Sequence, residues 1–339
     1  MSSPERCLVV GPSWVGDMIV AQSLYRLLAT QAPGVSIDVL APAWSADVLA
    51  RMPEVRRTVV SPFAHGQFDW AGRRRLAREL RAEGYRRAIV LPNSWKSALV
   101  PFLAGIPQRT GYVGEFRYGL LNDARPLDKQ AVPRLVDRYC ALASEKHVSL
   151  HAPQPRLTVN SENQRTCLAR FGLALDRPVL ALCPGAEFGA AKRWPERHYA
   201  EIARARLAAG WQVWLLGSAR DGDVAEAVNR LAGGQCVNLA GRTSLGDVVD
   251  LMACASVVVT NDSGLMHLAA AVDVPVLAVY GSTDPGYTPP LSGKARVLSL
   301  KLDCSPCFKR ECPLGHLNCL NKLEPKQVLS ALNTMDTHS

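Results

Sequence analysis

Short apolar runs alternate with longer amphipathic stretches along the chain, and this alternation constrains the fold more than any other feature. An apolar run of about five residues between turn residues predicts a buried strand, whereas apolar residues spaced three or four apart predict a helix. Strands and helices in alternation form parallel sheets with crossover helices. We predict strands at residues 7–11, 35–40, 57–60, 87–91 and 108–112, and again at 179–183, 212–216, 236–239, 256–260 and 275–280.

The two series of strands are separated by "HAPQPRLTVN" (151–160), which holds two prolines and no helical periodicity and is therefore expected to be a linker. A chain of 339 residues with 48% hydrophobic residues can bury two cores. We predict an α/β protein of two doubly wound, Rossmann-like domains, residues 1–155 and 156–339, that face each other across a cleft. In such sheets ligands bind beyond the carboxyl ends of the strands, so the strand-to-helix turns are the places to search.

Several classes of protein are disfavoured. The sequence has no run of about 18 apolar residues and no leader of the secretory type, so we expect a cytosolic protein. Neither the G-x-G-x-x-G spacing of a dinucleotide site nor the G-K-[ST] of a P-loop occurs, which argues against a dehydrogenase or a P-loop kinase.

Positive charge is concentrated in the first half of the chain. Residues 1–150 carry 20 Lys and Arg against 13 Asp and Glu, while the remaining residues carry 19 against 17. Such a surface attracts nucleic acid, anionic lipid headgroups or acidic glycans, although a solvated helix face is the simpler interpretation of any one arginine. The arginines cluster on one predicted helix and beyond it, at Arg73, Arg74, Arg75, Arg78, Arg81, Arg86, Arg87, Arg109 and Arg117, with Lys96 among them.

The first candidate turn is "GPSWVGDM" (11–18), between the strand at 7–11 and a helix predicted near 17–30. Its glycines, Gly11 and Gly16, allow the backbone to approach a ligand closely, and Asp17 follows at the start of the helix. The alternative is that Asp17 only caps the helix or complements its dipole.

The second candidate turn is "TNDSGLMHLAAA" (260–271), where Asp262, Ser263 and Gly264 open a helix. Free N–H groups at a helix start form an anion site, and His267 lies one turn further on the same face as Ser263. A capped helix with a buried histidine is the alternative.

The third candidate turn is "CPGAEFGAAKRWP" (183–195), a loop of small residues that carries Lys192 and Arg193. A cation there can neutralise a diphosphate, the alternative being a surface lysine. The pair Asp221 and Asp223, in "GSARDGD", follows a strand and precedes a helix, so we expect it to cap that helix and not to bind a metal.

Ten cysteines in a chain of this length are too sparse for a disulfide scaffold, and most are expected to be buried apolar residues. The segment 304–319, "CSPCFKRECPLGHLNC", differs because its spacing Cys304-x2-Cys307-x4-Cys312-x6-Cys319, with His316 inside, is typical of metal sites. A structural zinc, disulfides and free thiols all remain open.

Five segments in order resemble the ADP-heptose:lipopolysaccharide heptosyltransferases, in particular those of type II: "GPSWVGDM", "LPNSWKSALVPFLAGIPQRTGY", "FRYGLLND", "PGAEFGAAKRWP" and "TNDSGLMHLAAA". The resemblance implies a GT-B architecture in which the first domain binds the acceptor and the second binds the ADP-sugar. It also implies an inverting glycosyltransferase that moves L-glycero-D-manno-heptose onto the first heptose of the lipopolysaccharide inner core without a metal. No cofactor is then required.

The resemblance also assigns roles. Asp17 would be the general base, with Lys192 stabilising the departing ADP. Further donor contacts would come from Glu187, Thr243, Asp262, Ser263, Gly264 and His267, and acceptor contacts from Gly16, Asn93, Lys96 and Arg117. The lipid-linked acceptor and the basic first half together predict reversible contact with the cytoplasmic face of the inner membrane.

Two alternatives remain at this stage. One is a heptosyltransferase I, which adds the first heptose to Kdo2-lipid A. The other is a nucleic-acid-binding protein with a zinc tail, motivated by the basic first half.

Overall fold

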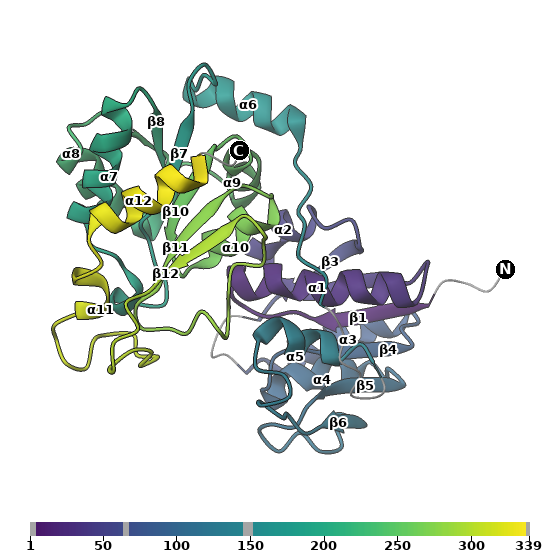
Figure 1. Cartoon of the computed structure of the whole chain (residues 1–339). Helices are drawn as coiled ribbons and strands as arrows, with labels where there is room; N and C mark the ends of the chain where they lie inside the picture. Colours follow the sequence, from purple (N-terminus) through teal and green to yellow (C-terminus); the bar gives the residue numbers. More distant parts are fainter. Residues whose placement is uncertain (1–4, 64–67, 145–151, 337–339) are drawn as a thin grey trace. The chain divides into compact units, whose positions relative to one another are not determined.

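Both predicted series of strands form parallel sheets (Figure 1). The computed structural model describes residues 5–63, 68–144 and 152–336. The chain divides into two units, unit 1 (Met1–Pro155) and unit 2 (Arg156–Ser339), and each contains one six-stranded sheet with helices on its faces. The predicted α/β, doubly wound fold is therefore confirmed.

The sheet of unit 1 has the order β3-β2-β1-β4-β5-β6, with every neighbouring pair parallel. Leu8 and Val10 of β1 pack with α3 and α4 on one face, so the alternate residues Cys7 and Val9 face the other side. The elements are β1 (Arg6–Val10), α1 (Val15–Gln31), β2 (Ser36–Pro42), η1 (Ala43–Ser45), α2 (Ala46–Leu49), β3 (Val55–Ser61), α3 (Trp70–Arg81), β4 (Arg87–Val90), α4 (Trp95–Leu103), β5 (Gln108–Tyr112), β6 (Asp123–Arg125) and α5 (Leu135–Ala141).

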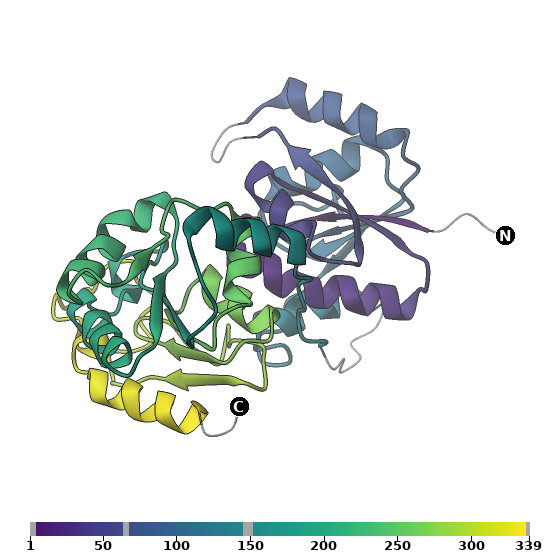
Figure 2. The ribbon, with the colours of Figure 1, turned by 90° about the horizontal axis from the view of Figure 1, so that it is seen from above.

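Unit 2 repeats the plan with the order β12-β11-β10-β7-β8-β9. Its last helix, yellow in Figure 2, packs beside α7 and over β11. The elements are α6 (Ser161–Phe171), β7 (Val179–Cys183), η2 (Ala190–Lys192), α7 (Glu196–Ala208), β8 (Gln212–Leu215), η3 (Ala219–Asp221), α8 (Gly222–Leu231), β9 (Val237–Asn238), α9 (Leu245–Met252), β10 (Val257–Asn261), α10 (Gly264–Ala271), β11 (Val276–Val279), β12 (Ala295–Leu298), α11 (Asn318–Asn321) and α12 (Pro325–Asp336).

All ten predicted strands are present, and the two that the sequence analysis missed, β6 and β12, are short edge strands. Their residues are mostly only partly buried, so no continuous apolar run marks them. Residues 152–160 form neither helix nor strand, in agreement with the expected linker, whose first residue, His151, lies outside the described residues. Among the described helices, none has the length and apolarity needed to cross a bilayer.

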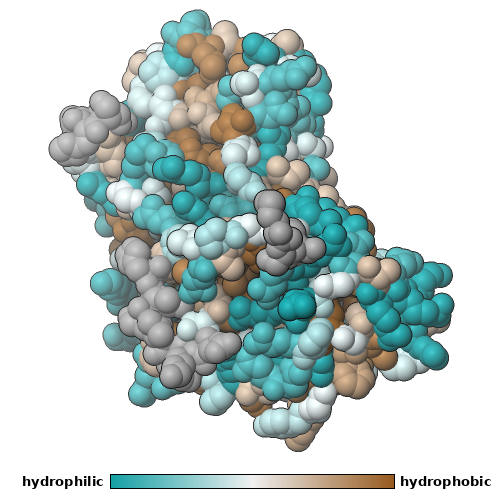
Figure 3. All heavy atoms as spheres, turned by 90° about the vertical axis from the view of Figure 1, so that its right-hand side faces the viewer, coloured by the Kyte–Doolittle hydropathy of each residue, from teal (hydrophilic) through white to brown (hydrophobic). Residues whose placement is uncertain are grey.

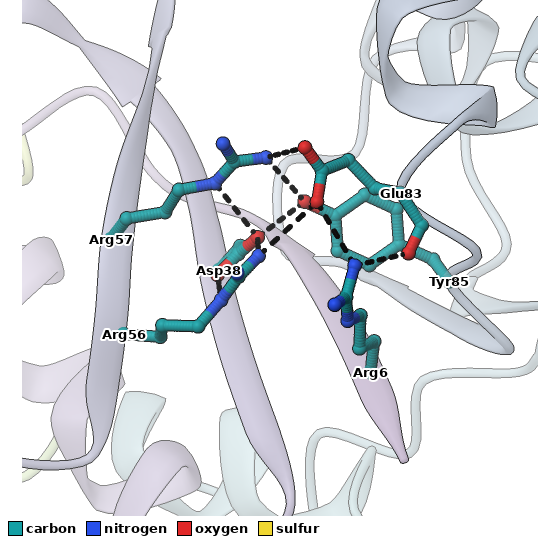
Figure 4. Close-up of polar contacts among 6 residues, drawn as sticks. All are labelled: Arg6, Asp38, Arg56, Arg57, Glu83 and Tyr85. Atoms are coloured by element: carbon teal, nitrogen blue, oxygen red, sulfur yellow. Dashed lines mark hydrogen bonds and ion pairs between the residues drawn. The ribbon is translucent and has the colours of Figure 1, made fainter. Parts of the chain in front are cut away.

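A network of charged side chains ties the amino ends of three strands of unit 1 together (Figure 4). Asp38 in β2 is fully buried and accepts hydrogen bonds from Arg56 and Arg57 of β3 and from the hydroxyl of Tyr85. Glu83 extends the network, because its carboxylate lies 2.8 Å from Nη2 of Arg57 and 3.1 Å from Nη1 of Arg6 in β1.

The network stabilises the charged form of Asp38. Burial by itself would raise the pKa of Asp38, but the hydrogen bonds from Arg56, Tyr85 and Arg57 outweigh it and hold that pKa below its ordinary value. A carboxyl whose pKa is lower in the folded state stabilises the fold at pH values above its unfolded pKa of about 4. That stabilisation is lost as the pH falls through the lower, folded pKa.

We predict that Asp38→Asn lowers the free energy of unfolding by about 2–3 kcal/mol at pH 7, because it removes the negative charge and replaces one of two buried acceptor oxygens with a donor group. Urea unfolding measures the loss, and the difference from the unaltered protein should shrink below about pH 4. The control is Glu79→Gln on the exposed face of α3. A difference that does not change with pH would contradict the role given to the ionised carboxyl.

Candidate functional site

The carboxyl end of β10 is organised by the buried side chain of Asn261. Its Oδ1 accepts hydrogen bonds from the backbone N–H of Trp194 and from the hydroxyl of Tyr199, each at 3.0 Å. Its Nδ2 donates to the carbonyl oxygen of Pro184 at 2.8 Å and to that of Gly185 at 3.2 Å. One amide therefore joins the end of β10, the loop after β7 and the start of α7. The sequence analysis did not single out Asn261, although it lies in the quoted motif.

Lys192 lies in that loop and is paired with Asp262. Its Nζ is 2.6 Å from Oδ2 of Asp262, which also accepts a hydrogen bond from the hydroxyl of Thr283 at 2.5 Å. The side chains of Lys192 and Asp262 are 15% and 6% exposed. The ring of Phe188 lies 4.9 Å from the ammonium. The predicted cation is thus held in place and not a loose surface lysine, and Thr283 is a contact that the sequence did not indicate.

Ser263 and Gly264 lie at the start of α10, as the sequence predicted. Ser263 is the N-cap residue, but its hydroxyl makes no capping bond and lies 3.3 Å from that of Thr260. The first N–H groups of a helix have no acceptor within it, so this turn presents donors suited to an anion.

His267 is buried one turn into α10. Burial lowers the pKa of His267 to about 4, an effect that the carboxylate of Asp262 opposes and the ammonium of Lys192 reinforces. The imidazole is therefore neutral at pH 7. Next to a phosphate it can donate one hydrogen bond but adds no charge.

The remaining donor candidates lie at the surface of unit 2. Glu187 is exposed and its carboxylate is 2.9 Å from Nη1 of Arg220. Thr243, in the loop before α9, is half-buried. Asp221 caps the short helix η3, because its carboxylate accepts hydrogen bonds from the N–H and the hydroxyl of Ser218 in a capping box. It is also the N-cap residue of α8, but there its side chain makes no capping bond. The carboxylate packs against Gly185, where a Cβ would lie 2.2 Å from it, so a larger residue at position 185 would displace the side chain of Asp221.

In unit 1, Asp17 lies in the first turn of α1, directly beyond the carboxyl end of β1. Its side chain is half-buried and Gly16 is buried. The N-cap residue of α1 is Trp14, whose side chain makes no capping bond, so the carboxyl group does not occupy the N-cap position. The structure thus places an acid at the strand-to-helix turn where the sequence predicted one.

Arg117 differs from its expected role as an acceptor contact. The residue is 1% exposed, and its guanidinium donates to the carbonyl oxygens of Tyr112 and Pro92 and to Oδ1 of Asn93. Burial lowers the pKa of Arg117 to about 10. Because its N–H groups donate to these oxygens, Arg117 orders the loop that precedes α4 and does not present a charge at the surface. Asn93 itself is exposed, and Lys96 in α4 is half-buried near the ring of Phe68.

The cysteines divide as expected between core and tail. Five are buried, at positions 7, 140, 167, 183 and 236, whereas Cys304 is exposed and Cys307, Cys312 and Cys319 are half-buried. All four of the tail line one pocket together with His316. As these side chains stand, the described part of the chain contains no group of three or more His, Cys, Asp or Glu that could hold a metal ion. A structural zinc is one of the three states that the spacing leaves open, and this arrangement of the side chains does not support it.

Comparison with known proteins gives consistent matches. Residues 73–318 match the family model for glycosyltransferase family 9 (heptosyltransferase). The lipopolysaccharide heptosyltransferase 2 of Escherichia coli K12 is 48% identical, over 97% of this chain and 98% of its own. The lipopolysaccharide heptosyltransferase 1 of Pseudomonas aeruginosa is 27% identical over the same share of both chains.

A solved structure agrees with these matches. The Escherichia coli ADP-heptose lipopolysaccharide heptosyltransferase II superposes with a TM-score of 0.86 and 45% sequence identity, and the alignment covers 97% of this chain and 98% of that one. Similarity at this level concerns the whole chain, both units included. It favours an enzyme over the nucleic-acid-binding alternative.

We predict that the free energy of unfolding falls as the pH is lowered from about 6.5 toward 4. In this range His267 becomes protonated in the unfolded chain, whereas in the folded chain its lower pKa keeps it neutral. The variant His267→Gln should flatten this part of the profile. Chemical unfolding at pH 7.5, 6 and 5 measures it, with exposed His316→Gln as the matched control. An imidazole resonance of His267 that titrates near 6.5 would refute the assignment.

Proposed function

The chain belongs to glycosyltransferase family 9, the heptosyltransferases, and we propose that it transfers L-glycero-D-manno-heptose from ADP-heptose to the first heptose of the lipopolysaccharide inner core. The reaction is an inverting displacement that uses no metal ion. The observation that carries the proposal is the cluster at the end of β10, where Lys192, the start of α10 and His267 gather beside Asp262. The 48% identity to a heptosyltransferase 2, against 27% to a heptosyltransferase 1, favours the second transfer.

In the donor half, Lys192 supplies the positive charge that a diphosphate needs. An ammonium has three N–H donors, and Asp262 accepts from Nζ, so donors remain for phosphate oxygens. Asp262 carries the same charge as a phosphate, which makes it a positioning residue and not a direct contact. Thr283 in turn fixes the carboxylate of Asp262.

The departing ADP gains negative charge as the bond to the sugar breaks. The N–H groups at Ser263 and Gly264 and the neutral imidazole of His267 stabilise this charge by hydrogen bonds, and Lys192 does so by its charge. These groups are held in advance by the fold, so little reorganisation is required during the reaction. Glu187 and Thr243 contact the ribose, the adenine or the heptose of the donor.

In the acceptor half, Asp17 acts as the general base. A carboxylate is ionised near pH 7 and can accept the proton of the acceptor hydroxyl as that oxygen attacks the anomeric carbon. Inversion requires the attacking oxygen and the leaving phosphate to lie on opposite faces of the sugar. Gly16, Asn93 and Lys96 contact the acceptor, while Arg117 shapes the loop that carries Asn93.

The decisive experiment offers ADP-heptose to the purified chain with three acceptors, which carry no heptose, one heptose or two heptoses on Kdo2-lipid A. We expect product only from the acceptor with one heptose, detected by mass spectrometry. Product from the acceptor without heptose would identify a heptosyltransferase I instead, and no product from any acceptor would refute the proposal.

Two variants separate the roles of the halves. Asp17→Asn should lower kcat by about 10²–10⁴-fold with unchanged affinity for ADP, because it removes only the base. Lys192→Ala should weaken ADP binding as well, as measured by calorimetry. The matched controls are Asp47→Asn, an exposed acid in the first turn of α2, and Lys294→Ala, whose ammonium pairs with exposed Asp273. An active Asp17→Asn enzyme would exclude Asp17 as the base.

We also propose that unit 1 contacts the anionic cytoplasmic face of the inner membrane. The buried side of α3 faces the sheet, while Arg74, Arg75, Arg78 and Arg81 are exposed. At the start of α3, Phe68 and Trp70 are about half exposed. On the face seen in Figure 3, hydrophilic residues predominate and hydrophobic ones form separate patches. The exposed arginines of α3 favour a reversible electrostatic contact over insertion.

The double variant Arg74→Gln/Arg78→Gln should bind anionic vesicles about 10- to 30-fold more weakly, since each basic residue near such a surface contributes about 1 kcal/mol. Co-sedimentation with phosphatidylglycerol vesicles at low and high salt measures this. The control is Arg165→Gln/Arg197→Gln, which removes two exposed arginines from unit 2. Binding that is independent of salt would contradict the proposed contact.

A further inference from the structure

The segment between β12 and α11 (residues 299–317), together with Cys319, brings four cysteines to one pocket. Cys304, Cys307, Cys312 and Cys319 all line it, with Ala191 and Ser282 from the carboxyl end of the sheet of unit 2. Four thiols around one pocket suit a tetrahedral thiolate site for a transition metal.

Ser282 points independently to a ligand in this pocket. The residue is 1% exposed, and its hydroxyl has no hydrogen-bond partner among the residues that the structure describes. A buried hydroxyl without a partner is costly, and a thiolate sulfur beside it would accept its hydrogen. His316 also lines the pocket, but its Nδ1 already accepts a hydrogen bond from the N–H of Asn318, which leaves the four thiols as the better donor set.

We propose that Cys304, Cys307, Cys312 and Cys319 bind one Zn²⁺ ion, and that the ion fixes segment 299–317 against the loop that carries Lys192. Because no three of these groups could hold an ion as they stand in the described structure, binding must draw the sulfurs together. Each thiol that binds releases its proton. The metal takes no part in the transfer reaction.

The link to Lys192 is a backbone contact. The carbonyl oxygen of Arg310, between Cys307 and Cys312, accepts a hydrogen bond from the N–H of Ala191 at 3.0 Å. Gly189 approaches the same carbonyl so closely that a Cβ there would lie 2.4 Å from the oxygen. On the other side of the pocket, the N–H of Phe308 donates to the carbonyl of Ser282, the residue before Thr283. Segment 299–317 therefore forms backbone hydrogen bonds with the residues next to Lys192 and Thr283, the two side chains that contact Asp262.

The metal is tested first, because this part does not depend on the proposed function. The full chain is purified under reducing conditions without chelator and analysed by plasma mass spectrometry. We expect about one zinc per chain, lost in Cys307→Ser/Cys312→Ser and retained in Cys254→Ser, which alters a half-buried cysteine elsewhere in unit 2. Less than about a tenth of an equivalent of zinc in the unaltered chain, or a disulfide among the four cysteines, would overturn the proposal.

The coupling to Lys192 rests on the proposed function and is tested by ADP affinity. Removal of zinc with a chelator should weaken ADP binding about 10-fold, the scale on which supporting contacts act, with the fold checked by circular dichroism. Gly189→Ala should weaken ADP binding while it keeps the zinc. Unchanged ADP affinity after zinc loss would overturn the coupling, whereas a chain that never binds ADP would instead refute the proposed function.

Discussion

The donor half of the protein depends on one buried amide, that of Asn261. A parallel sheet brings the ends of β7 and β10 side by side, but it leaves the loops beyond them without a fixed shape. Asn261 supplies that shape, because it satisfies two donors and two carbonyls from loops that the sheet does not pair. Lys192 lies two residues before Trp194, whose N–H donates to this amide, and Asp262 directly follows Asn261, so the two charged side chains can meet. The position of the charged Lys192 side chain thus depends on the neutral, hydrogen-bonded amide of Asn261.

In unit 1 the buried ionic network lies at the opposite end of the strands from the candidate catalytic residue. Asp38, Arg56 and Arg57 lie near the amino ends of their strands, whereas Asp17 follows the carboxyl end of β1. The paired charges of the network are engaged with each other, so they tie the strands together without competing for an anionic ligand (Figure 4). The opposite edge keeps its turns available for binding, which is where open α/β sheets place their ligands. The charge of Arg117 is also engaged within the protein. Its buried guanidinium orders the loop that carries Asn93, and Asn93 itself stays exposed.

The sequence predicted the strands and the turns because both depend on local pattern. Apolar runs marked ten strands, including the edge strands β3 and β9, but the short edge strands β6 and β12 are mostly only partly buried and have no such run. The motifs also located Asp17, Lys192 and His267 at the correct turns. What the sequence could not predict are contacts between side chains far apart in the chain: the pairing of Lys192 with Asp262, the bond from Thr283, and the burial of Arg117. These depend on packing in three dimensions, and an arginine in a motif gives no indication whether its five donors face water or carbonyl oxygens.

The energetics of segment 299–317 support a cross-link within it. Ordering a residue costs about 1–2 kcal/mol of conformational free energy, which a helix or a buried core normally offsets. This segment has no helix or strand, and although Leu300 packs against the core of unit 2, the large apolar side chains of Phe308 and Leu314 are 50% and 60% exposed. Its hydrogen bonds to Ala191 and Ser282 contribute only about 1 kcal/mol each. A structural zinc ion in a thiolate site adds binding free energy that only the ordered segment receives. An ion held by the four cysteines would therefore account for why a polar, irregular segment lies fixed beside the loop that carries Lys192.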